Sequence, residues 1–224
     1  MRPDFNTEKI MENIKCKYFG DEKICENDKY YKDYCAFGKE PKGILKKFYN
    51  KELFRKSLEC KFKYSGEEIT VILLNPSFAC EKGLDLTLNN LKKFLLTVGN
   101  YSSFRVLNIF PIRTPKSSLL SDLLKKKKFK KYQCENKQYL LDEIAKSNKI
   151  VIAWGGKYNQ EAISFLDELR KKKEKLSLFA YHLNKDGSPT HFSSQAYNKI
   201  KEKKIFEIVL TENTNGKKYF RPAN

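Results

Sequence analysis

The sequence predicts an α/β domain in which a central, mainly parallel sheet lies between two layers of helices. Four short apolar runs are separated by segments with helical periodicity, an alternation typical of parallel strands joined by crossover helices. The runs lead into turns that carry Asn75, Asn108, Gly155 and His191. Because the carboxyl ends of parallel strands meet at one edge of a sheet, these residues are expected to share a site. We therefore predict a three-layer α/β/α fold.

The strands are predicted from short runs of apolar or alternating residues. Residues 57–64 alternate apolar and polar side chains, which predicts a half-exposed strand that forms a hairpin with the next run. Residues 205–211 are expected to form an edge strand. The central strands are predicted at residues 69–74, 104–109, 149–153 and 176–181.

The helices are predicted from apolar residues at helical spacing and from capping residues. Short helices are expected at residues 4–14, 45–53, 119–124 and 194–201, and longer ones at residues 85–98, 138–147 and 158–173. Residues 125–131 contain six lysines around one phenylalanine. This run is interpreted as a solvated loop, with a loop that contacts phosphate as the alternative.

Two regions are distinguished by composition. Residues 1–50 form a basic, aromatic-rich N-terminal extension, and residues 51–224 form the α/β domain. Aromatic rings among lysines suit single-stranded nucleic acid, but the same rings are also expected where an extension packs on a domain. Both interpretations of the extension remain open.

The charge of the chain is strongly basic. Its 224 residues include 45 Lys and Arg against 27 Asp and Glu, a formal net charge of +18. Such an excess favours a polyanionic partner, because neutralised phosphates release counterions, although a solvated lysine-rich surface is the alternative. No apolar stretch is long enough to cross a membrane, and Met1–Ile10 lacks the apolar core of a signal peptide. A cytoplasmic monomer is expected.

The cysteines are expected to be ordinary reduced thiols. Cys16, Cys25 and Cys35 lie in a polar, aromatic-rich segment, and Cys60 would be a fourth ligand if a zinc or iron–sulfur site existed. No C-x-x-C pair occurs, and spacings of eight and nine residues match no common metal pattern. The prediction is therefore no metal and no cofactor.

Taken in order, the strand-end motifs resemble those of the uracil-DNA glycosylase superfamily. Residues 74–77 (LNPS) are similar to its first motif, where a carboxylate or an asparagine follows an apolar strand and precedes proline. Residues 106–108 resemble the strand whose asparagine contacts the extruded base. Residues 152–156 (IAWGG) resemble its Leu-Trp-Gly-Ser segment, and residues 188–197 its His-Pro-Ser-Pro-x-Ser-Ala motif.

A closer resemblance is to a family of small bacterial and phage proteins of unknown function. That family shares an LNPS motif, a D-x-T segment, an N-hydrophobic-F-x-x-R-x-T segment, an AWG motif and a G-x-P-x-H motif. Here these are residues 74–77, 85–87, 108–114, 153–155 and 187–191. Two departures from the uracil enzymes stand out: Phe192 follows His191 in place of proline, and the first motif has no carboxylate.

The resemblance implies a DNA glycosylase that hydrolyses the N-glycosidic bond of a modified base, in defence against phage with modified DNA. Asn75 would position a water, Asp85 would supply the missing carboxylate, and His191 would donate a hydrogen bond to the departing base. Asp85, His191 and Asn108 each also have a structural interpretation. Asp85 would cap a helix, and His191 would make a structural hydrogen bond. Asn108, the expected reader of the base edge, would cap a strand end.

The remaining candidate residues would bind the base or the DNA backbone. Ser77, Phe78, Trp154 and Gly155 are expected to line the base pocket, with a core position as the alternative for Trp154. Phosphates are assigned to Arg113, Lys157, Ser193 and Ser194. The partner is thus DNA. The alternative functions are a nucleic-acid-binding module of the same fold without chemistry, and an enzyme that processes nucleotides or nucleosides.

Overall fold

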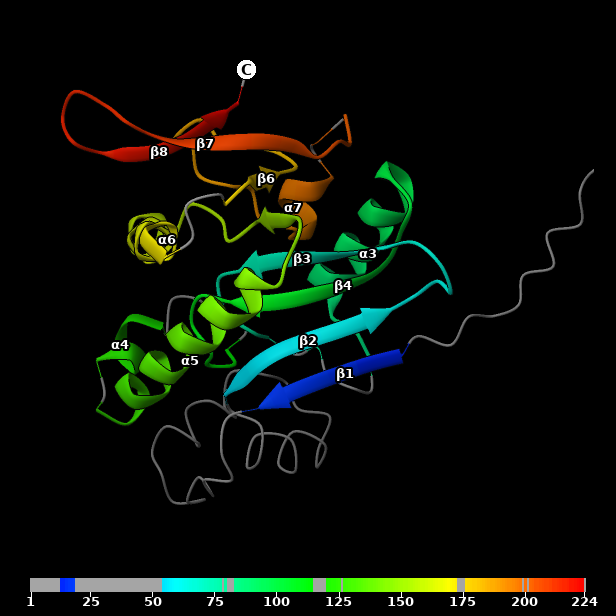
Figure 1. Cartoon of the computed structure of the whole chain (residues 1–224), viewed down its shortest axis with the longest axis horizontal. Coiled ribbons are helices and arrows are strands. Elements are labelled where there is room, and N and C mark those ends of the chain that lie inside the picture. Colours follow the sequence, from blue (N-terminus) through cyan, green and yellow to red (C-terminus); the bar gives the residue numbers. More distant parts are fainter. Residues whose placement is uncertain are drawn as a thin grey trace, which may run out of the picture.

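The structure is a computed structural model that describes residues 13–18, 54–77, 79, 83–114, 120–125, 127–172, 176–198, 200 and 202–223. In these residues eight strands form one sheet, in the order β1-β2-β4-β3-β5-β6-β7-β8 (Figure 1). The strands are β1 (Asn13–Tyr18), β2 (Arg55–Lys61), β3 (Glu67–Leu73), β4 (Tyr101–Asn108), β5 (Ile150–Ile152), β6 (Leu178–Ala180), β7 (Phe206–Glu212) and β8 (Lys218–Pro222). The helices are α3 (Leu86–Val98), α4 (Leu120–Leu124), α5 (Lys127–Ala145), α6 (Asn159–Lys172) and α7 (Ser194–Tyr197).

Four parallel strands form the centre of the sheet, and they confirm that the four apolar runs are strands of one sheet. β3 pairs in parallel with β4 on one side and with β5 on the other, and β5 pairs in parallel with β6. Asn108, the last residue of β4, lies opposite Leu73, the last residue of β3. The chain therefore leaves both strands at the same edge, on the side toward which the β3 arrow points in Figure 1.

The prediction of a mainly parallel three-layer α/β/α fold is wrong, because the sheet is mixed. Of the seven strand pairings in the described residues, β1–β2, β2–β4, β6–β7 and β7–β8 are antiparallel. The parallel centre is thus flanked on each side by two antiparallel strands. The apolar pattern predicted the centre because strands buried on both faces are continuously hydrophobic, whereas the flanking strands carry polar side chains and depend on their neighbours.

The outermost strands, β1 and β8, lie where the sequence predicted none. β1 belongs to the predicted extension, and its residues Asn13 and Ile14 pair with β2, so the helix predicted for residues 4–14 is wrong at its end; residues 4–12 of that helix, like the helix at 45–53, fall outside the described residues. β8 pairs with β7, which makes β7 an interior strand of the sheet and not its edge.

The predicted hairpin of residues 57–64 with residues 69–74 does not form. β4 lies between these two strands, antiparallel to β2 and parallel to β3. Leu107 of β4 is opposite Ser57 on one side and Ile72 on the other. The short connection between the two strands suggested a hairpin, but this was misleading. Next to β4, β3 takes a more buried position than it would next to β2.

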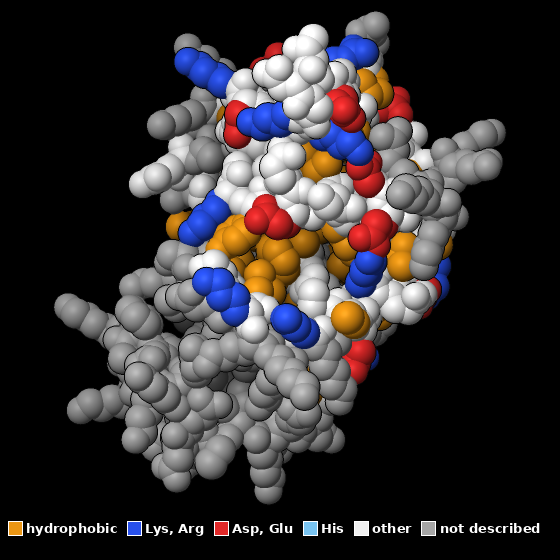
Figure 2. Space-filling model, turned by 90° about the vertical axis from the view of Figure 1, so that its left-hand side faces the viewer, with side chains coloured by type: hydrophobic (Ala, Val, Ile, Leu, Met, Phe, Trp, Pro, Cys, Tyr) orange, Lys and Arg blue, Asp and Glu red, His pale blue; other side chains and the backbone are white. Residues whose placement is uncertain are grey.

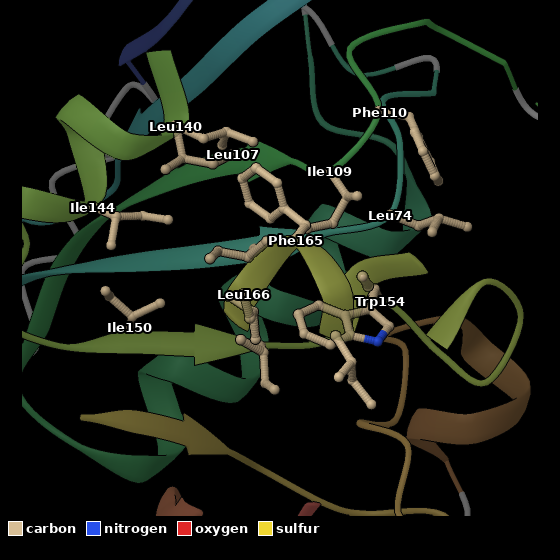
Figure 3. Packing of buried hydrophobic residues seen from close by; sticks show 14 of the residues in the cluster. Leu74, Leu107, Ile109, Phe110, Leu140, Ile144, Ile150, Trp154, Phe165 and Leu166 are labelled. Carbon is tan, nitrogen blue, oxygen red and sulfur yellow. The ribbon is translucent and has the colours of Figure 1, made fainter. Parts of the chain in front are cut away.

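Hydrophobic side chains pack on both faces of the sheet. On one face, Ile72 and Leu107 pack with residues of α5 and α6, including Leu140 and Leu166 (Figure 3). On the other face, Val71 and its neighbours pack with residues of α3. The α3 contribution consists of Leu88, Leu91, Phe94 and Leu95, the four residues whose spacing predicted this helical face.

Two helices differ from their predicted extents. α5 begins at Lys127, so most of the lysine run at residues 125–131 is helical and not a loop. The prediction of a loop rested on the charge of the run, but lysine is a good helix former and continues an amphipathic helix without strain. α7 spans only Ser194–Tyr197, where a helix to residue 201 was expected. None of the helices in the described residues has the length and apolar character needed to cross a membrane.

Candidate active site

A pocket of about 290 Å³ lies where β3 and β5 end. We call it the strand-end pocket. Its walls come from the start of β2, the end of β3, the start of α3, the segments that follow β4 and β5, and the turn after β6. The lining residues are Arg55, Leu73, Leu74, Asn75, Ser77, Asp85, Thr87, Leu88, Thr114, Trp154, Gly155, Gly156, Lys157 and His191. Each of the five motifs singled out in the sequence contributes at least one residue, because parallel strands deliver their following loops to the same edge.

Asn75 is held in one orientation by the loops that end β3 and β4. Its side-chain nitrogen Nδ2 donates to the carbonyl of Pro76 at 2.8 Å and to the carbonyl of Thr114 at 2.7 Å. An amide nitrogen has two hydrogens, and both are used here. The side-chain oxygen Oδ1 is therefore the atom with which Asn75 can accept a hydrogen bond from a ligand or a water.

Asp85 performs the capping role and also lines the pocket. Its Oδ1 accepts a hydrogen bond of 3.0 Å from the Leu88 amide, which fixes the start of α3. Its Oδ2 accepts a longer one, 3.4 Å, from the Ala79 amide. Carboxylates are favoured at helix N-termini, so this site suits an ionised side chain. The two interpretations of Asp85 made from sequence are compatible in this geometry.

His191 is fixed by hydrogen bonds on both its ring and its backbone. Its ring Nδ1 accepts a 3.1 Å hydrogen bond from the Ser193 amide, and its carbonyl accepts a 2.8 Å bond from the Tyr181 hydroxyl. We therefore assign the proton of the neutral ring to Nε2. Burial lowers the pKa of His191 from its ordinary value, and the nearby charge of Asp85 opposes this effect. The ring is thus neutral at neutral pH and can donate through Nε2.

The turn that carries His191 is tied together by its own side chains. Asp186 accepts from both the amide and the hydroxyl of Ser188, at 3.0 and 2.6 Å. Asn184 donates to the Ser188 hydroxyl and accepts from the Thr190 hydroxyl, at 2.9 and 3.0 Å. Ser188 and Thr190 are buried, and hydrogen bonds are stronger away from water. The network therefore holds the turn, and with it His191, in a fixed position.

The segment after β5 packs against the His191 turn. Gly155 has φ +86° and donates from its amide to the Pro189 carbonyl at 2.9 Å. A Cβ at Gly155 would lie 3.5 Å from the Cβ of His191. Gly155 thus lies next to His191, in a backbone conformation with positive φ that glycine adopts most readily. Lys157, which follows, is exposed and lines the pocket.

Trp154 is primarily a core residue that also borders the pocket. Its ring is buried among the cluster of Figure 3, and it makes an edge contact with Phe220 at a centroid distance of 5.8 Å. Its indole Nε1 donates to Oδ1 of Asn159 at 2.8 Å. Because both the ring and its donor are engaged by the protein, the core alternative describes Trp154 better than a stacking platform.

Asn108 is not brought to the pocket with Asn75, Asp85 and His191. Its side chain has no exposed surface, and within the described residues neither Oδ1 nor Nδ2 has a hydrogen-bond partner. Its carbonyl accepts from Nδ2 of Asn136, a residue of α5. A buried amide without hydrogen-bond partners lowers stability, and the fold tolerates this cost at Asn108. The neighbouring residue on β3, Leu73, does line the pocket.

Arg113, a predicted phosphate ligand, is buried beneath the loop that follows β3. Its Nε donates to the Ser77 carbonyl at 3.0 Å, and its Nη2 donates to the Ala79 carbonyl at 3.2 Å. Arg55 donates from Nη1 to the same Ala79 carbonyl at 2.7 Å. Two buried guanidinium groups thus hold the loop that forms one wall of the pocket.

The other predicted residues are placed as follows. Ser77 lines the pocket, and Ser193 contributes its amide to His191. Ser194 begins α7. Phe78 lies outside the described residues.

Seven lining residues were not predicted as site residues: Arg55, Leu73, Leu74, Thr87, Leu88, Thr114 and Gly156. All of them except Arg55 lie in a motif already named or directly beside one, so their position relative to the motifs was the signal that could have identified them. Arg55 comes from β2, and nothing in its local pattern distinguished it from other basic residues of the chain.

The pocket region is mixed in charge. Arg55 and Lys157 line it with Asp85. Figure 2 views the molecule from the left of Figure 1; on that face hydrophobic side chains gather in a central hollow, with Lys and Arg and with Asp and Glu around it.

Within the described residues, no group of three or more His, Cys, Asp or Glu side chains is placed to hold a metal ion. Cys16 and Cys60 lie on the neighbouring strands β1 and β2. Cys25 and Cys35 fall outside the described residues.

Comparison with known proteins gives one result. A family model described as "Protein of unknown function (DUF1643)" matches residues 55–191. Comparisons with curated proteins and with solved structures each found no match. The matched range runs from Arg55 to His191, the first and last lining residues of the strand-end pocket. The match covers more than half of the chain, and the protein therefore belongs to this family of unknown function.

Proposed function

We propose that the protein is a DNA glycosylase that hydrolyses the N-glycosidic bond of a base extruded into the strand-end pocket. The observation that carries the proposal is the meeting of Asn75, Asp85 and His191 in one pocket. They supply an acceptor with a fixed orientation, a carboxylate, and an imidazole whose Nε2 bears the proton. Hydrolysis of a bond between a sugar carbon and a base nitrogen needs these three functions.

The reaction can be written with these groups in balance. Oδ1 of Asn75 and the carboxylate of Asp85 accept hydrogen bonds from a water molecule, whose oxygen attacks the anomeric carbon. The carbon–nitrogen bond breaks, and its electron pair leaves with the base. The Asp85 carboxylate stabilises the positive charge that develops on the sugar and receives the water proton. Nε2–H of His191 donates to the departing base and stabilises its negative charge.

The size of the pocket and the charge of the chain support the substrate class. A volume of about 290 Å³ lies near the lower end of the roughly 300–1,000 Å³ of ligand pockets, which suits a single base. The excess of 18 positive charges suits a polyphosphate. The resemblance of the motifs to glycosylases, and the absence of a carboxylate from residues 74–77, favour a modified base over uracil.

Base release from defined oligonucleotides tests the proposal. Single- and double-stranded DNA carrying uracil, thymine mispairs or modified bases would be incubated with the protein, and abasic sites would be cleaved with alkali. We expect strand cleavage with at least one base. Asn75→Ala and His191→Ala should each reduce the rate about a hundred- to a thousandfold.

Asn100→Ala is the matched control for Asn75→Ala, because Asn100 is an exposed asparagine at the opposite end of the sheet. It should keep the full rate. Cleavage of free nucleosides but not of DNA would identify a nucleoside-processing enzyme. Binding of DNA without release of any base would leave a binding module and reject the glycosylase.

A further inference from the structure

A second hollow lies on the far side of the turn that carries His191. It has a volume of about 400 Å³ and lies between residues 183–187, the residues that join β7 to β8, and β8 itself. We call it the β8 groove. Lys185, Lys217 and Arg221 contribute three positive charges to its lining, and Asp186 contributes one negative charge.

We propose that the β8 groove binds the phosphate backbone of a single-stranded nucleic acid that flanks the base in the strand-end pocket. Three cations in one groove give the charge complementarity that such a backbone requires. The single carboxylate, Asp186, is turned toward Ser188, from which it accepts two hydrogen bonds. Its charge is therefore partly satisfied within the turn, and the groove keeps an excess of positive charge.

An aromatic residue makes the groove suitable for a strand with unstacked bases. Tyr219 and Arg221 alternate with Lys218 and Phe220 along β8. Phe220 is buried in the core cluster, whereas Tyr219 is half-buried in the lining of the groove. Cations that follow a backbone, combined with an aromatic ring on which a base stacks, are the usual means of binding single strands without sequence preference.

The groove and the strand-end pocket share one wall. A Cβ placed on Gly156, which lines the pocket, would lie 3.2 Å from the Ser188 hydroxyl and 3.5 Å from Oδ2 of Asp186. Asp186 lines the groove. The thickness of one turn thus separates the two sites, and a strand that places a base in the pocket can reach the groove with an adjacent part of its backbone.

The β8 groove is built to a fixed shape. Gly187 has φ +74°, and a Cβ there would lie 2.9 Å from both the Phe220 carbonyl oxygen and the Cβ of Tyr219. The Gly187 carbonyl accepts from the Phe220 amide at 3.2 Å. The turn and β8 are therefore in backbone contact, which sets the spacing between Lys185 on one wall and Arg221 on the other.

Salt-dependent binding of a fluorescent oligothymidine tests the charge of the groove. The double variant Lys185→Ala/Lys217→Ala would be compared with Lys61→Ala/Lys93→Ala, which removes two exposed lysines that line neither hollow. The slope of log affinity against log salt should fall by about 1.4 for the groove variant, because each phosphate that is no longer neutralised reduces the slope by about 0.7. The control should retain the wild-type slope.

A base-free strand tests the stacking. We expect the wild-type protein to prefer oligothymidine over an abasic strand of equal length by roughly tenfold, the order of magnitude of one stacked base. Tyr219→Leu, which keeps an apolar contact with Gly187, should remove this preference and leave the salt slope unchanged. An acidic peptide that competes as well as the abasic strand, with no preference for bases, would contradict a nucleic-acid partner.

The link of the groove to base release rests on the proposed function, but the two proposals fail differently. If no base is released from any DNA and the groove variant still shows the reduced salt slope, only the glycosylase proposal falls. If base release is observed, and the groove variant binds with the same slope and affinity as its control, the β8 groove is not a phosphate site.

Discussion

The amide of Ser193 donates a 3.1 Å hydrogen bond to Nδ1 of His191. This contact determines which ring nitrogen of the neutral imidazole carries the proton, and it leaves Nε2 as a donor beside the strand-end pocket. Phe192, between the two residues, is buried and stacks on Tyr181 at a centroid distance of 4.1 Å. The position of the imidazole is thus set by a packed aromatic residue and by one backbone amide.

Replacement of His191 should separate the two functions of its ring. His191→Asn retains an acceptor near the position of Nδ1, and should keep the Ser193 contact while losing the donor at Nε2. His191→Gln places an amide nitrogen near the position of Nε2. We expect base release to fall about a hundred- to a thousandfold in the asparagine variant and to be partly restored in the glutamine variant. Equal rates in all three proteins would remove His191 from the reaction.

The pH dependence of stability should reveal the half-buried imidazole of His191. Its folded-state pKa lies below the ordinary 6.5 because burial disfavours the charged ring, with Asp85 opposing. As pH falls below about 6.5, the unfolded chain takes up a proton before the folded chain does, so folding stability declines until the folded pKa is passed. Urea unfolding at pH 7.5, 6.5 and 5.5 should show a larger loss for the wild type than for His191→Asn. Parallel losses in the two proteins would contradict the lowered pKa.

Arg113 should matter for stability more than for contact with DNA. Arg113→Met removes the hydrogen bond to the Ser77 carbonyl and one of the two hydrogen bonds to the Ala79 carbonyl, which keeps its bond from Arg55. The loss of these two charge-assisted bonds should lower the free energy of unfolding by about 2 kcal/mol. Arg113→Lys should recover only part of this, because an ammonium group cannot reproduce the fork of a guanidinium. Denaturant titration measures the change. A methionine variant of normal stability that has lost DNA affinity would restore the phosphate role predicted from sequence.

Gly187 and Gly216 form a matched pair for measuring the close approach of the His191 turn to β8. Both have φ +74°, but a Cβ at Gly187 would lie 2.9 Å from the Phe220 carbonyl, whereas at Gly216 the nearest atom is Glu212 Oε1 at 3.7 Å. Alanine should cost about 1 kcal/mol at either site from backbone strain, and about 1–3 kcal/mol more at Gly187 from the clash. Equal melting temperatures for the two variants would show that the turn can move away from β8.

The motifs of the site were readable from sequence because each one is local. An apolar run followed by Asn75-Pro76, or by Gly155-Gly156, indicates a strand end wherever the strand is placed, and parallel strands gather such ends. Asn75, Asp85 and His191 were predicted to share a pocket on this basis, and they do. Asn108 was predicted to join them for the same reason, but its side chain is buried next to Leu73. Whether a side chain at a strand end is buried depends on packing, which the sequence of the strand end does not specify.

The predicted phosphate contact of Arg113 also depended on burial, which the local sequence does not specify. From sequence, an arginine in a polar turn looks accessible to a ligand. In the fold, the loop that follows β3 covers it, and its guanidinium donates to the Ser77 carbonyl and, together with Arg55, to the Ala79 carbonyl. Only the tertiary structure reveals that Arg113 holds the loop after β3 in place.

Sequence alone determined the four apolar strands, the amphipathic face of α3 and the strand-end residues Asn75, Asp85 and His191, because burial and local turn chemistry are written in neighbouring residues. The tertiary structure decided the mixed character of the sheet. β1 and β8 consist of polar, lysine-bearing segments that become strands by pairing with β2 and β7. The partner of β1 is distant in the chain, and β8 pairs with a strand edge that exists only once the sheet has folded. No local sequence pattern therefore specifies these two strands.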